Sequence, residues 1–176
     1  DIPSNVLTYL QLYPYRLHLP QIYGQLLDKN QTLGAEIWLL EYSSLPTNDR
    51  GELKYSQLIP QLQDLWQQAN GLRQLHWLWQ IARLWYPLHS KGVASTLLDP
   101  YLLRVNNSIV QLLELKIDRN ESPKLMQLGQ FWSQWIATAS NDIKEFLQEL
   151  CFRLENRDIT KKEQLIASLE KAIEHN

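Results

Sequence analysis

Hydrophobic residues recur with helical spacing over most of the chain beyond residue 57. The apolar face of a first predicted helix consists of Leu58, Leu62, Leu65, Trp66 and Ala69. Asn70-Gly71 is typical of the end of such a helix, because glycine tolerates the backbone conformation that follows a last turn. A longer hydrophobic stripe runs from Leu72 to about Leu88 and stops at Lys91-Gly92. We therefore expect a second, central helix there.

The last third of the chain predicts three further helices. Their expected ranges are residues 125–136, residues 143–154 and a segment that begins at Thr160. Thr160-Lys161-Lys162-Glu163 has the form of a capping box, in which a threonine and a glutamate three residues later satisfy the first N–H groups of a helix. The pattern therefore places the start of the last helix at Thr160.

Strand patterns occupy two other regions. Pro3, Pro14 and Pro20 interrupt the first forty residues, so we expect an extended, strand-bearing segment without a long helix. Within it, residues 19–27 and 35–42 read as two strands joined by a polar turn, which predicts a hairpin. A second, shorter hairpin is predicted from residue 102 to residue 113, with its turn at residues 106–108.

Composition and charge narrow the class of protein. The chain has 176 residues, 44% of them hydrophobic, and its 17 basic and 19 acidic residues give a net charge of −2. This mixed balance does not favour a nucleic-acid partner, and no apolar run approaches the roughly 20 residues of a membrane span. With no signal-peptide pattern we expect a cytoplasmic protein. The chain begins at Asp1 without Met, so we expect a piece of a longer polypeptide.

The single cysteine, Cys151, excludes an internal disulfide and a multi-cysteine metal site. Its apolar neighbours predict a small buried core residue. Glutamines are scattered along the helical stretches and read as parts of solvated helix faces. No spacing of His, Asp or Glu predicts a metal site, and nothing in the chain points to a cofactor.

The order of the predicted elements resembles that of a protein kinase, from the last strands of its small lobe to the end of its large lobe. The stretches that carry the resemblance are Leu39-Leu40-Glu41-Tyr42, Gly51-Glu52-Leu53, Leu88-His89-Ser90-Lys91-Gly92-Val93, the spacing of Leu98, Pro100 and Val105, and Leu128-Gly129. The resemblance implies a mostly α (α+β) fold. Residues 1–42 would then hold remnant small-lobe strands and the hinge, and residues 43–176 a helical large lobe.

The same resemblance implies that the catalytic residues are lost. The His-Arg-Asp of the family falls on Ser95, Thr96 and Leu97, its metal-binding Asn falls on Leu102, and its catalytic-loop lysine falls on Asp99. Leucine can neither accept a proton nor bind a metal, and losing a general base alone lowers rates by about 10²- to 10⁴-fold. We therefore expect a pseudokinase, which is not an enzyme.

A second alignment also fails to supply a catalytic set. If Asp99 were the catalytic Asp, the metal-binding position would fall on Arg104, a cation. Where the family has Asp-Phe-Gly the chain has Glu114-Leu115-Lys116, and the activation segment shortens to about residues 117–122. Asp99 precedes Pro100, and this pair favours a turn over an acid–base role.

A few residues remain candidates for binding. By resemblance, Glu41 and Tyr42 would line a nucleotide hinge, and Glu114 keeps a carboxylate at the metal-nucleotide position, although it also reads as a polar strand-end residue. Trp77 and Tyr86 cannot share a helix face with all the other aromatics of the central helix, so they either pack under neighbouring elements or form an exposed interaction surface.

We expect a non-catalytic regulatory or protein-interaction domain. Tyr15 to Gly24 is similar to segments that precede the catalytic domain in cyanobacterial type-2C serine/threonine phosphatases, which implies that the full polypeptide is a phosphatase and that this part regulates it. The alternatives are a nucleotide-sensing pseudokinase and an unrelated helical adaptor. The expected partner is a protein or an attached catalytic domain, with no nucleic acid and no membrane, and the oligomeric state stays open.

Overall fold

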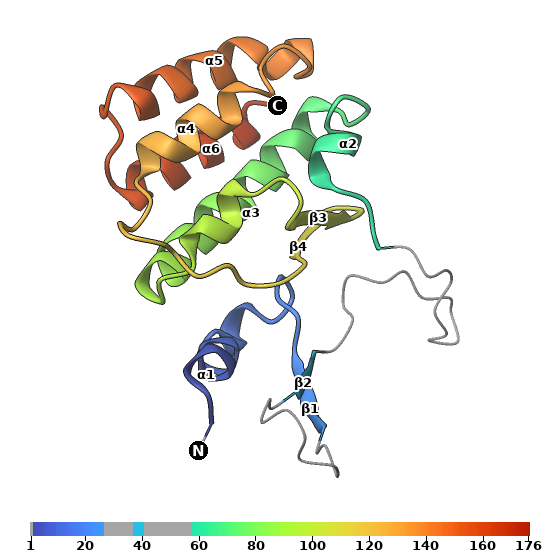
Figure 1. Ribbon diagram of the computed structural model, residues 1–176. Coiled ribbons are helices and arrows are strands. Elements are labelled where there is room, and N and C mark those ends of the chain that lie inside the picture. Colours follow the sequence, from blue (N-terminus) through green and yellow to red (C-terminus); the bar gives the residue numbers. More distant parts are fainter. Residues whose placement is uncertain (1, 27–36, 41–57) are drawn as a thin grey trace.

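The computed structural model describes residues 2–26, 37–40 and 58–176. Over these ranges the protein is mostly helical and belongs to the α+β class, with two small antiparallel sheets (Figure 1). The elements beyond residue 57 are α2 (Leu62–Trp66), α3 (Gly71–Ser90), the 3₁₀ turn η2 (Ala94–Leu98), β3 (Leu103–Asn106), β4 (Ile109–Leu112), α4 (Leu125–Ser133), α5 (Asn141–Glu155) and α6 (Lys162–Glu174). The boundary expected at residue 42 falls outside the described residues.

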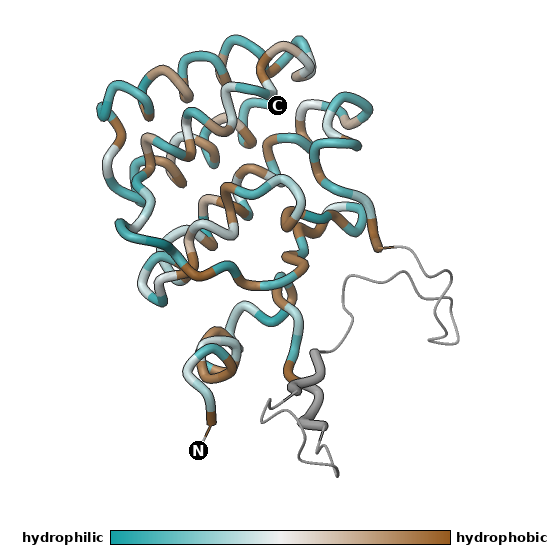
Figure 2. Tube along the Cα trace, in the orientation of Figure 1, coloured by the Kyte–Doolittle hydropathy of each residue, from teal (hydrophilic) through white to brown (hydrophobic). Residues whose placement is uncertain are grey.

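Helix α3 is the centre of the molecule and confirms the long helix expected from Leu72 to Leu88. Helix α6 packs along it, and α4 and α5 pack against each other on the same side (Figure 1). Because α3 also supports the β3–β4 hairpin, it buries side chains around most of its circumference, and hydrophobic residues recur along it (Figure 2). One continuous buried core joins α3 to helices α4, α5 and α6 and to the β3–β4 hairpin.

Gln74 corrects the expectation that the glutamines lie on solvated faces. Its side chain is fully buried on α3. The amide Nε2 donates to the carbonyl of Trp66 at 2.6 Å, and Oε1 accepts from the backbone N–H of Ser140 at 2.9 Å. These bonds satisfy both ends of the amide, so a polar side chain can lie in the core. Gln74 thereby joins α2 and the start of α5 to the central helix.

Gly129 lies where α4 packs closely against α5. A Cβ atom at this position of α4 would lie 2.6 Å from Cβ of Leu154 and 3.2 Å from the carbonyl oxygen of Cys151 on α5. Only a residue without a side chain allows the two helices to approach this closely. Cys151 itself is buried, as expected, and burial raises the pKa of its thiol to about 12.

The β3–β4 hairpin confirms the second hairpin that the sequence predicts. Leu103 pairs with Leu112 and Asn106 with Ile109 in an antiparallel register. Asn107, in the turn, has φ of 54°, a left-handed conformation that asparagine tolerates better than most residues. Gln80 of α3 holds the hairpin, because its Nε2 donates to the carbonyl of Ser108 at 2.6 Å and its Oε1 accepts from the N–H of Val110 at 2.9 Å.

The N-terminal segment contains a helix that the sequence analysis missed. Helix α1 spans Ser4–Gln11, where only extended structure was expected. Pro3 lies just before the first turn, where proline costs no hydrogen bond, and Pro14 falls in the following 3₁₀ turn, η1 (Tyr13–Tyr15). The prolines therefore flank a short helix. Strands β1 (Ile22–Leu26) and β2 (Ile37–Leu40) then form the antiparallel hairpin that the sequence predicts.

The first helix beyond residue 57 is shorter than expected. Leu58 was placed on its apolar face, but residues 58–60 are not helical and α2 begins only at Leu62. Pro60 disfavours a helical conformation at Ile59. The extended segment instead joins the hairpin, because the N–H of Val105 donates to the carbonyl of Pro60 at 3.1 Å and Gln61 forms a β-bridge with Arg104.

The last helix begins two residues later than the capping box suggested. Its first residue is Lys162, and the side chain that caps it belongs to Gln164, not Glu163. Oε1 of Gln164 accepts from the N–H groups of Thr160 at 3.1 Å and Lys161 at 3.2 Å. Among the described residues, no helix combines the length and the apolar character that crossing a membrane would need.

Candidate functional site

The loop that follows α3 holds the positions where the resemblance places catalytic residues. Ser95 is bound to Asp118, whose Oδ1 accepts from the Ser95 N–H at 2.7 Å and from its hydroxyl at 2.5 Å. Thr96 is fully buried, and its Oγ1 accepts from the N–H of Lys116 at 2.8 Å. The N–H of Asp118 donates to the carbonyl of Gly92 at 2.8 Å. These bonds tie residues 92–96 to residues 116–118.

The remaining positions of this loop are also occupied by internal contacts. Leu97 is fully buried and Leu102 is 4% exposed, so both side chains belong to the core. Asp99 forms the turn that the sequence predicts, because its Oδ1 accepts from the N–H of Tyr101 at 3.0 Å. Its Oδ2 lies 3.2 Å from Nζ of Lys116. The carboxylate of Asp99 is therefore a turn residue with a cationic partner.

Glu114, the candidate for contact with a metal-bound nucleotide, has no charged partner among the described residues. Its side chain is exposed at the end of the hairpin and forms no ion pair with any described residue. Arg104 is 6% exposed and donates instead to the carbonyls of Ile59 and Tyr101, at 3.0 and 2.9 Å. Among the described residues, no three His, Cys, Asp or Glu side chains gather as a metal-binding group. Glu41 and Tyr42, the predicted hinge residues, lie outside the described residues.

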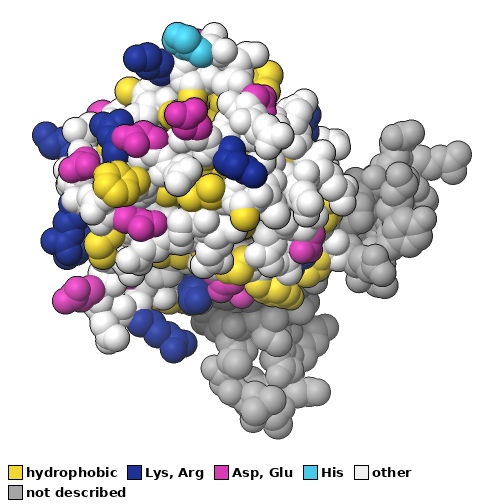
Figure 3. Space-filling model, turned by 90° about the horizontal axis from the view of Figure 1, so that it is seen from above, with side chains coloured by type: hydrophobic (Ala, Val, Ile, Leu, Met, Phe, Trp, Pro, Cys, Tyr) yellow, Lys and Arg dark blue, Asp and Glu magenta, His cyan; other side chains and the backbone are white. Residues whose placement is uncertain are grey.

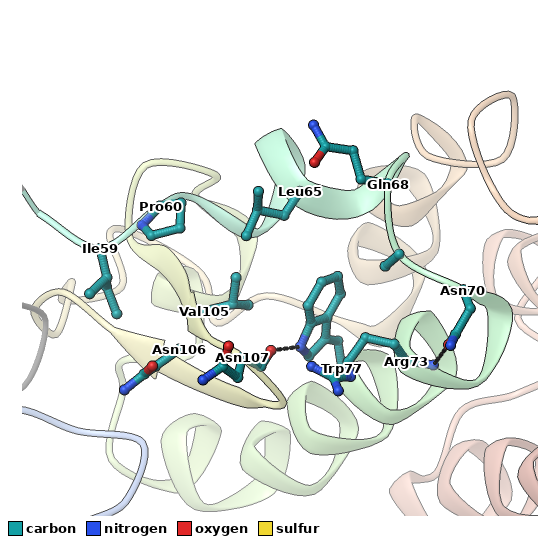
Figure 4. A pocket seen from close by; sticks show the side chains of 11 residues that line it. Ile59, Pro60, Leu65, Gln68, Asn70, Arg73, Trp77, Val105, Asn106 and Asn107 are labelled. Atoms are coloured by element: carbon teal, nitrogen blue, oxygen red, sulfur yellow. Dashed lines mark hydrogen bonds between the residues drawn. The ribbon is translucent and has the colours of Figure 1, made fainter. Parts of the chain in front are cut away.

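Trp77 is not part of an exposed interaction surface, and this alternative is wrong. Its side chain is 2% exposed because this side of α3 packs beneath the β3–β4 hairpin, and its Nε1 donates to the carbonyl of Asn107 at 3.1 Å (Figure 4). Trp77 instead contributes to one side of a groove of about 500 Å³. The groove is lined by Ile59, Pro60, Leu65, Gln68, Ala69, Asn70, Arg73, Trp77, Val105, Asn106 and Asn107.

This groove lies where three segments meet: the extended residues 59–60, the tip of the hairpin, and the corner between α2 and α3 (Figure 4). Its apolar residues are surrounded by side-chain amides, and Arg73 is the one charged residue among those that line it. Asn70 caps α3, because its Oδ1 accepts from the N–H of Arg73 at 2.8 Å. Such a mixture suits contact with a protein segment more than proton-transfer chemistry.

Tyr86 is exposed, as the surface alternative predicts, with 55% of its side chain accessible. It lines a cleft of about 380 Å³ at the C-terminal end of α3, where the segments that begin α4 and α6 converge. The lining residues are Trp85, Tyr86, His89, Pro123, Lys124, Leu125, Thr160, Lys161, Lys162 and Glu163. The sequence analysis did not connect these lysines, because they come from segments more than thirty residues apart.

The N-terminal segment is fastened to the hairpin by His18, another residue whose role the sequence did not reveal. The carbonyl of Val110 can only accept, so Nδ1 of His18 carries the hydrogen that forms the 2.8 Å bond between them. The N–H of Leu112 donates to the carbonyl of His18 at 2.8 Å. Burial lowers the pKa of His18 from 6.5. The bond to the Val110 carbonyl acts in the opposite direction and raises the pKa, but burial has the larger effect.

Comparison with known proteins returned no match to any family model, curated protein or solved structure. The kinase-like resemblance therefore stays a prediction from the residues quoted above.

Proposed function

We propose that this protein is a non-catalytic, kinase-like module that acts by binding another protein or a catalytic domain of its own polypeptide. The proposal depends on the hydrogen bonding and burial of residues 93–118, which leave no base or metal ligand at the expected catalytic positions. Phosphoryl transfer needs a base and metal ligands that face the substrate. Here Ser95 and Thr96 are bonded to Asp118 and Lys116, and Leu97 supplies buried carbon.

The arrangement of the elements supports the kinase-like part of the proposal. A long central helix is followed by a short loop, a small hairpin and three helices, in the order that the resemblance implies. The hairpin at residues 103–112 also weakens the alternative of an unrelated helical adaptor, whose sequence would have no reason to place strands there. A large-lobe fold and a cytoplasmic location belong to this proposal.

The attached partner that we propose is a type-2C serine/threonine phosphatase domain. This step depends on the likeness of Tyr15 to Gly24 to segments that precede such domains. In the structure, this stretch links η1 to β1 and packs Leu19 into the core that contains α3. A change that reached the hairpin could therefore be transmitted to the N-terminal segment, and from there to a neighbouring domain.

The proposal is tested by incubating the 176-residue chain with radiolabelled ATP, Mg²⁺ and a mixed protein substrate. We expect no transfer above the level of the heat-denatured protein, because the loop supplies no base and no metal ligand. Mg²⁺-dependent labelling that disappears in Asp99→Asn or Glu114→Gln would overturn the proposal. Labelling that survives both changes would instead indicate a contaminating kinase, which repeat purification removes.

The nucleotide-sensing alternative has a separate readout. Glu114 is exposed, so its carboxylate is accessible to a metal-bound nucleotide. A ligand present at a hundred times its Kd stabilises the folded state by about 2.7 kcal/mol, which a thermal melt detects easily. We expect the melting midpoint to be the same with ATP, with Mg²⁺-ATP and without nucleotide. A Mg²⁺-dependent rise that Glu114→Gln abolishes would favour nucleotide sensing over simple protein binding.

A further inference from the structure

The cleft beside Tyr86 brings together positive charges from two separate loops. Lys124 precedes α4, and Lys161 and Lys162 lie at the start of α6. Glu163 is the one acidic residue that lines the cleft. The lining therefore carries an excess of positive charge in a chain whose net charge is −2. This excess favours an anionic ligand.

Most of this charge has no internal partner. Lys124 and Lys161 form no ion pair with any described residue, and Lys162 approaches Glu163 only to 3.9 Å. The situation differs over α5, which carries both signs of charge: Lys144 and Arg153 are basic, and Glu145 and Glu149 are acidic. The face in Figure 3 likewise intersperses basic and acidic side chains. The lining of the cleft differs in holding three lysines and one acidic residue, Glu163.

The backbone N–H groups that precede α4 and α6 are used in capping, whereas the lysine side chains that line the cleft have no hydrogen bond to another described residue. The N–H of Lys124 already donates to Oε1 of Gln127 at 2.7 Å, and the N–H groups of Thr160 and Lys161 already donate to Gln164. Lys162 is held in place, because its Nζ lies 3.8 Å from the centre of the Tyr86 ring. A cation on an aromatic face keeps N–H groups that can still donate to an anion.

The cleft also has apolar and aromatic lining residues, namely Trp85, Tyr86, Pro123 and Leu125, which favours a ligand with more than a charge. Trp85 is 5% exposed, Leu125 is 7% exposed and Pro123 is buried, while half of the Tyr86 side chain remains accessible. A volume of about 380 Å³ accommodates a few side chains. A free inorganic anion would leave the exposed part of the Tyr86 ring uncovered, whereas a peptide would cover it.

We propose that the cleft formed by Tyr86, Lys124, Lys161 and Lys162 binds a segment of a partner protein that carries a phosphorylated serine or threonine. A phosphoryl group carries about −1.5 to −2 charges and three acceptor oxygens, so it suits a cleft lined by three lysines better than a single carboxylate does. The neighbouring residues of the peptide cover the exposed part of the Tyr86 ring. This proposal names the ligand of the binding module proposed above and rests on that function.

The experiment measures fluorescence anisotropy of a fluorescein-labelled peptide, Gly-Leu-phosphoserine-Leu-Gly, titrated with the whole chain. The unphosphorylated peptide, the same peptide with glutamate in place of phosphoserine, and a labelled oligothymidine of five nucleotides are titrated in parallel. Inorganic phosphate is added as a competitor in a further series. We expect saturable binding of the phosphopeptide, at least tenfold tighter than either other peptide, and only weak competition by phosphate.

A matched pair of triple variants locates the binding. The first is Lys124→Gln with Lys161→Gln and Lys162→Gln, which removes three positive charges from the cleft. The control is Lys144→Gln with Arg153→Gln and Lys171→Gln, which removes three positive charges from α5 and α6 elsewhere. Exposed ion pairs each change affinity by up to about fivefold, so we expect the first variant to bind about tenfold or more weakly. The control should stay within about twofold of the original chain.

Several results would overturn the proposal. Equal weakening in both triple variants would show non-specific attraction, and equal binding of the glutamate peptide would show that phosphate is not recognised. Tighter binding of the oligothymidine, lost in the first variant, would identify a nucleic-acid site instead. No detectable binding would also refute it. Thermal melts verify that each variant is folded. Phosphate transfer from ATP would refute the proposed function without changing these binding results, so the two failures are distinguishable.

Discussion

The loop and hairpin at residues 93–118 and the cleft beside Tyr86 both adjoin α3, yet they use polar groups in opposite ways. In the loop, Ser95 and Thr96 are bonded to Asp118 and Lys116. In the cleft, Lys124 and Lys161 form no ion pair with a described residue. Buried polar groups must be bonded to avoid a desolvation penalty, whereas exposed ammonium groups are satisfied by water. The loop therefore stabilises the fold, and the cleft keeps charges that a ligand can use.

The largest expected effect comes from restoring the expected catalytic carboxylate at Leu97. Leu97→Asp places a charge in a fully buried site and removes apolar contacts, so we expect it to lower the free energy of unfolding by about 4 kcal/mol or more. Urea denaturation measures this change. Leu97→Met, which conserves volume, should lose less than about 1.5 kcal/mol. A stable Leu97→Asp protein would mean that the loop is open to solvent, which would contradict the contrast drawn between the closed loop and the open cleft.

The next effect concerns the bonds that close the loop. Asp118→Ala removes the acceptor of the Ser95 N–H and hydroxyl, and we expect a loss of about 1–3 kcal/mol because a partly buried N–H loses its partner. Asp118→Asn keeps an acceptor oxygen and should lose less. Glu121→Ala, on the exposed part of the same segment, serves as a control with an expected change within about 0.5 kcal/mol. Equal losses in the Glu121 and Asp118 variants would count against a specific role for the loop bonds.

A smaller, pH-dependent effect should come from His18. Its pKa is lowered in the folded state by burial, and Arg83 of α3 adds to this. The unfolded state therefore binds a proton more readily, so this contribution to stability is present above pH 6.5 and is lost as the pH falls from 6.5 through the folded pKa. Urea midpoints at pH 7.5 and 5.0 should fall further apart for the original chain than for His18→Gln. His76→Gln, at an exposed site, should keep the original pH dependence.

The smallest expected effect concerns the role of the Tyr86 ring in ligand binding by the cleft. Tyr86→Ala removes the ring that holds Lys162, which should weaken phosphopeptide binding about two- to fivefold and change stability little. Tyr86→Phe keeps the ring and should bind like the original chain. Anisotropy titrations as described above measure both. Equal weakening in the two variants would indicate a hydrogen bond from the phenol oxygen in place of the ring contact.

Much of the fold was predictable wherever a local pattern was sufficient. The stripe from Leu72 to Leu88 and the hairpin at residues 103–112 are confirmed, because helical spacing and turn residues act over a few neighbours. Helix α1 and the extended residues 58–60 were missed. The first fits between flanking prolines, and the second pairs with a strand some 45 residues away, which no local window contains.

The candidate site was predictable only in part. The turn at Asp99 and the burial of Cys151 are confirmed. Helical spacing did not decide whether Trp77 and Tyr86 are buried or exposed. In the structure, Trp77 lies beneath the hairpin and Tyr86 faces solvent. The choice depends on which element covers each side of α3. The glutamine Gln74 was misjudged for the same reason, because its two bonding partners come from distant segments.

By itself, the amino-acid sequence determined the long helix α3, the two hairpins and the leucines at the positions where the proposed kinase-like resemblance places catalytic residues. These follow from side-chain chemistry and from spacing within a few residues. Only the tertiary structure decided that Asp118 closes the loop, that Trp77 is covered, and that Lys124, Lys161 and Lys162 share one cleft. The physical reason is that hydrogen bonding, burial and charge balance depend on distance in space, which the packing of α4 and α6 around α3 sets.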